Sequence, residues 1–286
     1  MSSPDKPHFD PPAAPEPTPI PFAVTPLSAT TYHPAANSGE NPVWSGWDVL
    51  VIAVLILGTL FFVQLFIILG ARHFAFPHAS WMEVAQKPSL ALLSQLLTYG
   101  AVALYMILLV EGKYHARFWQ AIRWNWPAGL GLRFVGAGVL MISFAQLERF
   151  LPMPKTTPFD QFFDRPLDAY LLVAFAVTLG PLMEEIFFRG FLYPVLARRT
   201  RAVPAILITG VLFGVVHSPQ YGYSWAVLII VLVGVVLTTI RAVTKSVASS
   251  FLAHIGYNGI QMILAIWATD GFRHMEKAAL MMGRLR

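Results

Sequence analysis

The dominant feature of the sequence is a series of apolar segments that begins near Trp44 and continues almost to the C-terminus. A helix needs about 20 residues to cross the hydrocarbon core of a bilayer, because each residue advances it by about 1.5 Å. Seven segments are of this order, although the fifth is short. They are Val49–Gly70, Leu90–Val110, Leu132–Leu147, Leu167–Leu196, Pro204–His217, Trp225–Ile240 and Val247–Ala268. The sequence therefore predicts an all-α, polytopic membrane helical bundle of seven or eight transmembrane helices.

The composition excludes several other classes of protein. Hydrophobic residues make up 56% of the chain and charged residues only 12%, about half of the charged share of roughly 25% that is typical of soluble domains. The net charge of the chain is +5. In such an apolar chain, an excess of Lys and Arg is typical of the cytoplasmic loops of a membrane protein rather than of a surface that binds nucleic acid. We therefore expect a lipid bilayer and no nucleic acid among the partners. The absence of cysteine excludes thiol catalysis and thiolate metal sites.

The chain divides into four regions by composition. Residues 1–43 contain eleven prolines and no long apolar run, which predicts a disordered tail. Residues 44–166 hold the first transmembrane helices, residues 167–268 the later ones, and residues 269–286 form a basic C-terminal tail. Trp44 and Trp47 precede the first helix, where tryptophan typically anchors a helix at the membrane interface. Basic residues in alternate loops favour a cytoplasmic N-terminus in the cell (inner) membrane.

Two adjacent carboxylates interrupt the fourth apolar segment. A single acidic residue at the centre of a transmembrane helix costs roughly 2.5–3.5 kcal/mol, so Glu184 and Glu185 need partners inside the bundle. Glu185 and Arg189 stand four residues apart with the acid first, the favourable orientation for a helical ion pair. Glu184 lies about 100° around the helix from Glu185, with no partner evident from the sequence. A packing network of these charges is one interpretation, and a general base is the other.

Two later apolar segments carry further polar residues. One of them ends in Phe213-Gly-Val-Val-His217. Gly214 of this motif and the preceding Gly210 have the GxxxG spacing that lets a second helix approach closely. In His254-Ile-Gly-Tyr-Asn258, the histidine and the amide lie one turn apart and project from the same face. Together with the diacid, these groups are suited to hydrolysis. Glu184 and a histidine would handle the proton of a water molecule, and a second histidine and Asn258 would donate hydrogen bonds to an oxyanion.

Metal catalysis uses the same residue types. Glu184, His217 and His254 are a possible set of three Zn²⁺ ligands with an open fourth position. The helical HExxH signature of metalloproteases is absent, as is GxSxG. Residue spacing does not distinguish direct glutamate catalysis from zinc catalysis.

The three polar motifs resemble those of a known family. Glu184-Glu185-Ile-Phe-Phe-Arg189, Phe213-Gly-Val-Val-His217 and His254-Ile-Gly-Tyr-Asn258 are similar, in this order, to the EExxxR, FxxxH and HxxxN motifs of the CAAX prenyl protease and bacteriocin-processing family of intramembrane endopeptidases. The resemblance covers about Leu167–Ala268, which it implies is the catalytic transmembrane domain.

The resemblance implies a membrane-embedded peptidase that hydrolyses a membrane-associated peptide or protein. It implies that Glu184 and His217 activate water, that His254 and Asn258 stabilise the oxyanion, and that Glu185, Arg189 and Phe213 organise the site. It favours a mechanism that requires no cofactor, with Zn²⁺ as the alternative. Neither a prenyl group nor any other particular substrate is indicated.

Two other functions use the same residues. Some members of the family act as membrane scaffolds without proteolysis. A proton-coupled transporter would use Glu184, His217 and His254 as a relay, but transporters often carry matching interrupted helices in both halves. The first two apolar segments contain no such acid, which disfavours transport.

Overall fold

The computed structural model describes residues 39–275 except 128–135, 139–140, 153 and 155. These residues belong to one compact unit that spans residues 34–286. Within this part every regular element is a helix and there is no strand, as the sequence predicts. The predicted proline-rich tail falls outside the described residues up to residue 38, as does the C-terminal tail from residue 276.

The described elements are α-helices, three π-helical segments (η1, η2 and η5) and two 3-10 helices (η3 and η4). In chain order they are α1 (Gly46–Gly70), η1 (Ala71–Ala75), α2 (Trp81–Ala85), α3 (Pro88–Leu108), η2 (Leu109–Lys113), α4 (Phe118–Ala121), η3 (Ser143–Phe150), η4 (Pro158–Phe163), α6 (Pro166–Val177), α7 (Leu179–Glu184), η5 (Glu185–Leu192), α8 (Tyr193–Thr200), α9 (Ala202–Val216), α10 (Ala226–Thr244) and α11 (Val247–Ala268).

Among the described residues, five helical stretches are long and apolar enough to cross a membrane. They are Gly46–Ala75, Pro88–Lys113, Pro166–Thr200, Ala226–Thr244 and Val247–Ala268. The predicted short segment corresponds to α9, which has 15 residues. The predicted span Leu132–Leu147 lies partly outside the described residues, and its described end belongs to η3. The predicted count of seven or eight therefore stays a prediction.

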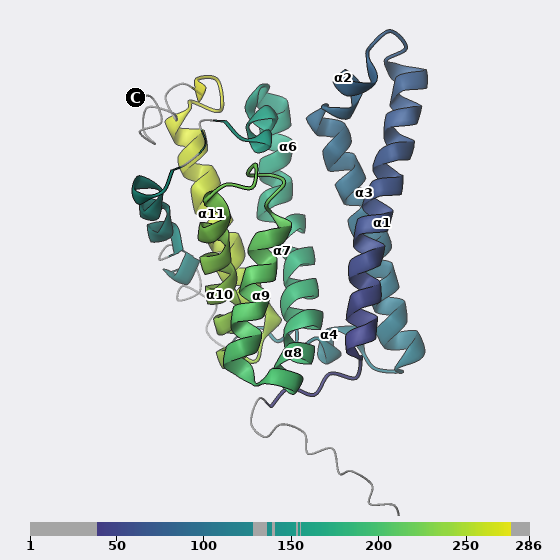
Figure 1. Cartoon of the computed structure of the whole chain (residues 1–286), viewed down its shortest axis with the longest axis vertical. Coiled ribbons are helices and arrows are strands. Elements are labelled where there is room, and N and C mark those ends of the chain that lie inside the picture. Colours follow the sequence, from purple (N-terminus) through teal and green to yellow (C-terminus); the bar gives the residue numbers. More distant parts are fainter. Residues whose placement is uncertain (1–38, 128–135, 139–140, 153, 155, 276–286) are drawn as a thin grey trace, which may run out of the picture. The chain divides into compact units, whose positions relative to one another are not determined.

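Helices α1 and α3 run side by side in opposite directions, connected through α2 at one end (Figure 1). Helix α1 begins with a capping box, in which Ser45 and Asp48 satisfy each other's backbone N–H groups. Large apolar side chains are exposed along much of this helix and around about half of its circumference, such as Leu57 at 69% and Phe66 at 68% exposure. An apolar face of this kind is suited to lipid contact.

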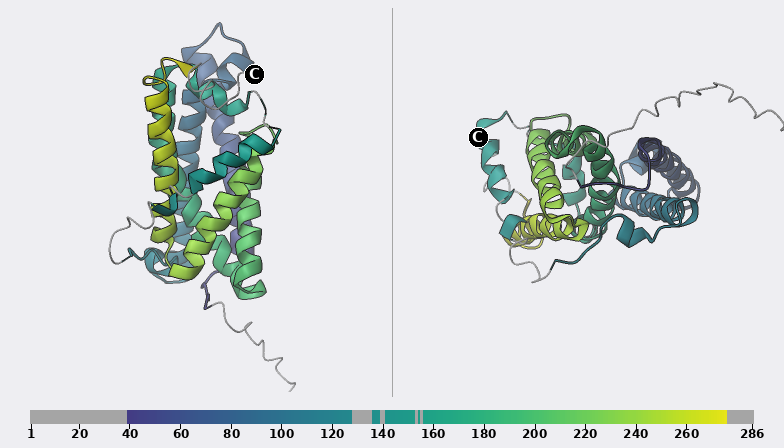
Figure 2. Two further views of the ribbon diagram at one scale, coloured as in Figure 1. Left: turned by 90° about the vertical axis from the view of Figure 1, so that its left-hand side faces the viewer. Right: turned by 90° about the horizontal axis from the view of Figure 1, so that it is seen from below.

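Helices α9 and α10 pack closely against each other, as two views show (Figures 1 and 2). The contact passes through the predicted GxxxG pair. A Cβ atom on Gly210 would lie only 2.8 Å from the backbone nitrogen of Val235, and one on Gly214 would lie 3.0 Å from that of Val231. Only glycine allows the two backbones to come this close, so the prediction of a close helix contact is confirmed. The contact positions His217, which follows α9 directly.

The predicted segment Leu167–Leu196 is not one continuous α-helix. At Thr178 the backbone departs from helical geometry, with φ −120° and ψ −82°, so that α6 ends and α7 begins. From Glu185 to Leu192 the chain then forms the π-helix η5. A π-helix inserts extra residues into a turn and is frequently found at functional sites. The diacid stands where α7 passes into η5.

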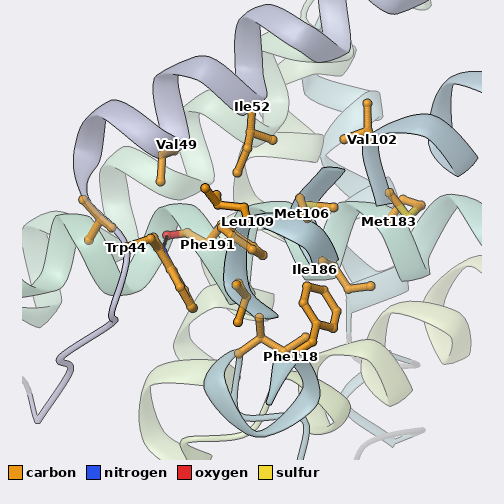
Figure 3. Packing of buried hydrophobic residues seen from close by; sticks show 13 residues of the cluster. Trp44, Val49, Ile52, Val102, Met106, Leu109, Phe118, Met183, Ile186 and Phe191 are labelled. Carbon is orange, nitrogen blue, oxygen red and sulfur yellow. Dashed lines mark hydrogen bonds between the residues drawn. The ribbon is translucent and has the colours of Figure 1, made fainter. Parts of the chain in front are cut away.

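Trp44 is buried, which corrects its assignment as an interfacial anchor. Its side chain is 1% exposed, its ring stacks on Phe191 with centroids 4.4 Å apart, and its indole N–H donates to the Phe191 carbonyl at 3.1 Å. The two residues lie in the main apolar cluster, which joins α1, α3 and η5 (Figure 3). Trp47, in contrast, is 74% exposed. A short sequence window cannot distinguish a tryptophan that caps a distant carbonyl from one that meets lipid headgroups.

The last residues of the predicted tail also contact the helices. Glu40 is buried, and Arg241 of α10 donates to both of its carboxylate oxygens at 2.9 and 3.2 Å. Arg123 donates to Glu40 and to the carbonyl of Gly39. Arg198 of α8 donates to two further carbonyls of this segment. Residues 39–45 therefore form a strap across the ends of α8 and α10, which we call the N-terminal strap.

Candidate active site

A cavity of about 460 Å³ holds the polar residues that the sequence singled out. Glu184, His217, His254 and Asn258 all line it. They come from α7, from the residue that follows α9, and from α11. The rest of the lining is mainly apolar and aromatic, with four glutamine side chains. These are Gln95, Gln161, Gln220 and Gln261. A largely apolar cavity with a few convergent polar groups is the usual form of a ligand or active site.

Glu184 lies between the two histidines. One carboxylate oxygen is 3.7 Å from Nε2 of His217, and the other is 3.7 Å from Nε2 of His254. The Glu184 side chain is 22% exposed, whereas that of His254 is 4% exposed. The residue that had no evident partner in the sequence therefore has two. Both distances exceed that of a direct hydrogen bond, and a small polar group beside the pair can contact the carboxylate and an imidazole at once.

Glu185 points away from the cavity into a fully buried network. One of its oxygens accepts from Arg189 at 2.9 Å and lies 2.9 Å from Nδ1 of His254. The other accepts from the Ser250 hydroxyl at 2.6 Å. The predicted ion pair between Glu185 and Arg189 is thus present, and both side chains are fully buried. Because each oxygen has a partner, the network offsets part of the cost of burying the charge.

Arg189 extends this network to α10. Its guanidinium donates to the hydroxyl of Thr238 at 3.2 Å and to the carbonyl of Gly234 at 3.0 Å. Its Cζ atom also lies 4.5 Å from the ring centre of Phe213, a cation–π contact. The Phe213 ring in turn packs against both histidines, with centroids 4.7 Å from His217 and 5.8 Å from His254. Arg189 and Phe213 therefore connect η5, α9, α10 and α11 behind the cavity.

The hydrogen bonds assign the tautomers of both histidines. Nδ1 of His217 lies 2.7 Å from the carbonyl of Phe213, and a carbonyl can only accept. Nδ1 of His254 faces the Glu185 carboxylate, which likewise accepts when it is ionised. Each Nδ1 therefore carries hydrogen, and each Nε2 faces Glu184. At Nε2 a neutral ring accepts a hydrogen bond, and a ring with hydrogen on both nitrogens donates one.

Asn258 connects the cavity to the interruption between α6 and α7. Its amide nitrogen donates at 2.7 Å to the backbone carbonyl of Ala176, which lies two residues before the break at Thr178. The α6–α7 interruption and the HxxxN motif therefore occur at the same place in the structure. An amide nitrogen has two N–H donors, so the bond to Ala176 leaves a second one for a ligand.

The placement of the candidate zinc ligands decides whether they can hold a metal ion together. Among the residues that the structure describes, no group of three His, Cys, Asp or Glu side chains is placed so as to hold a metal ion. Glu184, His217 and His254 bring two ring nitrogens and a carboxylate together, but the three side chains are not placed as metal ligands.

Three groups that hold the site together were not predicted from the sequence. Ser250 bonds to Glu185, Thr238 to Arg189, and the Ala176 carbonyl to Asn258. Ser250 could have been found from its position one turn before His254, since residues four apart share a helix face. The other two belong to helices that only the tertiary structure brings to the site.

The comparison with protein families matches residues 166–260 to the model described as "Type II CAAX prenyl endopeptidase Rce1-like". The matched region contains all three motifs and begins with α6. No curated protein and no solved structure matches the chain. The family is one of proteases, so the match supports a CAAX-type intramembrane peptidase at the level of the family. The three motifs and the match agree in relating residues 166–260 to the type II, Rce1-like CAAX prenyl endopeptidases.

Proposed function

We propose that this protein is an intramembrane endopeptidase that hydrolyses a peptide bond in a membrane-associated peptide or protein. The observation that carries the proposal is the position of Glu184, with an imidazole Nε2 at 3.7 Å from each of its oxygens at the cavity surface. A carboxylate and two imidazoles around one gap are the groups that water activation needs. The family match supports the same reaction class.

In the proposed first step, a water molecule on the cavity side of Glu184 and His217 contacts both side chains. The Glu184 carboxylate takes one proton from this water while the oxygen attacks the carbonyl carbon of the substrate. The carbonyl π bond breaks, and its electron pair forms the oxyanion. His217 assists by accepting a hydrogen bond from the water through Nε2, since its Nδ1 is committed to the Phe213 carbonyl. A tetrahedral intermediate results.

His254 and Asn258 would stabilise that oxyanion. Asn258 has one amide N–H beyond the one it donates to Ala176. His254 can donate through Nε2 only when both of its nitrogens carry hydrogen. The Glu185 carboxylate, 2.9 Å from Nδ1, is the counter-charge for that protonated form. Preorganised donors of this kind are worth about 3 kcal/mol each in other hydrolases.

In the last step the C–N bond breaks and Glu184 delivers its proton to the leaving nitrogen. The products are a new carboxyl group and a new amine. No cofactor takes part in these steps. The proposed location is the cell (inner) membrane with the N-terminus in the cytoplasm, where the basic loops of the chain would lie.

The test is peptide cleavage by purified protein in detergent against a library of membrane peptides. Wild type, Glu184→Gln, and wild type with a strong chelator are compared. Glu83→Gln is the matched control, since Glu83 is an exposed acid outside the cavity. We expect cleavage by wild type and Glu83→Gln, retained with chelator, and a loss of at least about a hundredfold in Glu184→Gln.

Other results would identify the alternatives. Cleavage that is lost with chelator and restored by zinc would contradict the metal-free mechanism. Proton-coupled transport that Glu184→Gln abolishes would contradict the peptidase. A protein that folds, cleaves nothing in the library and is captured by a membrane partner equally well with and without Glu184→Gln would be a scaffold.

A further inference from the structure

One wall of the catalytic cavity is not made of long helices. It consists of η4 and of the turn that follows His217. Pro158, Phe159, Gln161 and Phe162 of η4 line the cavity. Pro219, Gln220 and Tyr221 of the turn line it as well. The other lining residues come from α3, α6, α7, α9, α10 and α11, together with His217. We call residues 158–163 together with residues 218–224 the aromatic cover.

The two halves of the aromatic cover are bonded to each other. The backbone N–H of Phe159 donates to the carbonyl of Gln220 at 3.2 Å. The ring of Phe159 stacks on that of Tyr221, with centroids 5.9 Å apart and planes inclined by 23°. The start of η4 is held by Thr157 and Asp160, which form a capping box. The aromatic cover is therefore held together by its own hydrogen bonds and ring contacts.

The turn connects the cover to His217. The carbonyl of His217 accepts from the N–H of Gln220 at 3.0 Å, and that of Ser218 accepts from Tyr221 at 3.2 Å. Only one residue separates His217 from Pro219, which already lines the cavity. A substrate group that contacts the cover therefore lies beside the histidine that we assign to water activation.

The chemistry of the cavity indicates which substrate groups fit there. Among the described lining residues, Glu184 is the only carboxylate and there is no lysine or arginine. A charged side chain placed in the cavity would lose its hydration without gaining an opposite charge, except beside Glu184 itself. The cover instead offers three aromatic rings, of Phe159, Phe162 and Tyr221. The glutamine side chains can bond to the peptide backbone of a substrate, since an amide both donates and accepts.

We propose that the aromatic cover is the specificity-determining wall of the site, and that Phe159, Phe162 and Tyr221 select an uncharged, apolar residue next to the scissile bond. The inference rests on the proposed peptidase function, because it assigns the cavity to a peptide substrate. It goes further by naming the residues that read the substrate and the class of side chain that they accept.

Neighbouring residues of η4 provide a matched pair of variants. Phe162 lines the cavity. Phe163 does not, and packs against Phe272 and against Phe159, with centroids 5.6 Å apart in both pairs. Both side chains are half-buried. Phe162→Ala therefore removes a cavity ring, whereas Phe163→Ala removes a similar ring from the support of the cover.

The first experiment measures cleavage. The probes are peptides with an Ala-Leu core in detergent micelles, with the residue after the cleaved bond varied among Leu, Ala, Asp and Lys. For wild type we expect kcat/KM for Leu to exceed that for Asp and Lys by about a hundredfold or more, because a charged group is left unpaired. Phe162→Ala should lower kcat/KM for the Leu peptide by about tenfold, mainly through KM, and change the Ala peptide little. Phe163→Ala should preserve the wild-type ranking.

The second experiment measures binding without cleavage, and so separates this proposal from the peptidase itself. Fluorescein-labelled forms of the same peptides are titrated against Glu184→Gln protein, alone and combined with Phe162→Ala or Phe163→Ala. We expect the Leu peptide to bind more tightly than the Asp and Lys peptides, and Phe162→Ala to weaken it by about tenfold.

If wild type cleaves nothing but this binding ranking is present, the peptidase proposal fails and the cover still selects apolar groups. If the peptides are cleaved but Asp and Lys are accepted as well as Leu, the cover proposal is overturned. It is also overturned if Phe162→Ala and Phe163→Ala change the ranking equally.

Discussion

The indole N–H of Trp44 donates to the backbone carbonyl of Phe191, 147 residues further along the chain, and the two rings stack. Phe191 lies in η5, two residues after Arg189, whose guanidinium holds Glu185. The N-terminal strap thereby contacts the same π-helix that carries the acidic motif (Figure 3). This contact makes the strap part of the support of the site.

Trp44→Phe separates the hydrogen bond from the packing. The phenyl ring can keep part of the stacking on Phe191 but cannot donate, so we expect a loss of about 1 kcal/mol in stability. Trp44→Ala removes the whole buried ring and should cost about 3–5 kcal/mol. The measurement is the thermal unfolding midpoint of the purified protein in detergent. Trp47→Phe is the control, because Trp47 is exposed, and an equal shift in that variant would contradict the assignment.

Glu40→Gln tests the ion pairs of the strap. The substitution leaves the guanidinium of Arg241 buried opposite a neutral amide, and breaking a buried pair in this way costs about 3–5 kcal/mol. We expect a lower unfolding midpoint for Glu40→Gln, and a smaller additional loss when Arg241→Gln is combined with it. A double-mutant cycle measures this coupling. Strictly additive losses would mean that the two side chains do not interact.

Ser250→Ala removes the hydroxyl that donates to Glu185. The oxygen of a buried carboxylate then loses a partner, which costs about 1–3 kcal/mol. Because Glu185 also bonds His254, kcat should fall while KM changes little. The cleavage assay and the unfolding midpoint check the two effects.

Ser249→Ala is the matched control for Ser250→Ala. The side chain of Ser249 is equally buried, and its hydroxyl has no hydrogen-bond partner among the residues that the structure describes, so its removal should be neutral or slightly stabilising. Ser250→Thr retains the hydroxyl and should restore part of the activity. Equal effects of Ser249→Ala and Ser250→Ala would refute a positioning role for Ser250.

Gly210→Ala tests the contact of α9 with α10. The added Cβ would lie 2.8 Å from the backbone nitrogen of Val235, so the helices must separate. Overpacking of this kind costs about 1–3 kcal/mol, and it would displace His217 at the end of α9. We expect reduced stability and reduced cleavage. Gly58→Ala on α1 is the control, since a Cβ there meets nothing within 4 Å and alanine favours a helix.

Much of the helical framework could be predicted from hydrophobic patterns alone. The segment predicted at Val247–Ala268 has the bounds that α11 has in the structure. The fold class follows from segment length, because a long apolar run has few alternatives to a membrane helix. The spacing of Glu185 and Arg189 was sufficient to predict their ion pair, since residues four apart in a helix are neighbours.

The π-helical turn of η5 and the break at Thr178 were not predictable in this way. Both lie within one continuous apolar run, although Pro181, which cannot donate to the carbonyl of Val177, favours an interruption next to Thr178. They are stabilised by partners from elsewhere in the chain. Trp44 bonds to a carbonyl of η5, and Asn258 bonds to a carbonyl before the break. Local propensity cannot report on such distant partners.

The sequence by itself determined that the chain is helical and membrane-embedded, and which rare polar residues mark its candidate site. These properties depend on composition and on spacing within single helices. The tertiary structure alone decided that Glu184 lies between His217 and His254, that Glu40 pairs with Arg241, and that η4 closes the cavity beside His217. Each of these relationships joins segments that are far apart in the chain, and it is formed only when helix packing brings their side chains together.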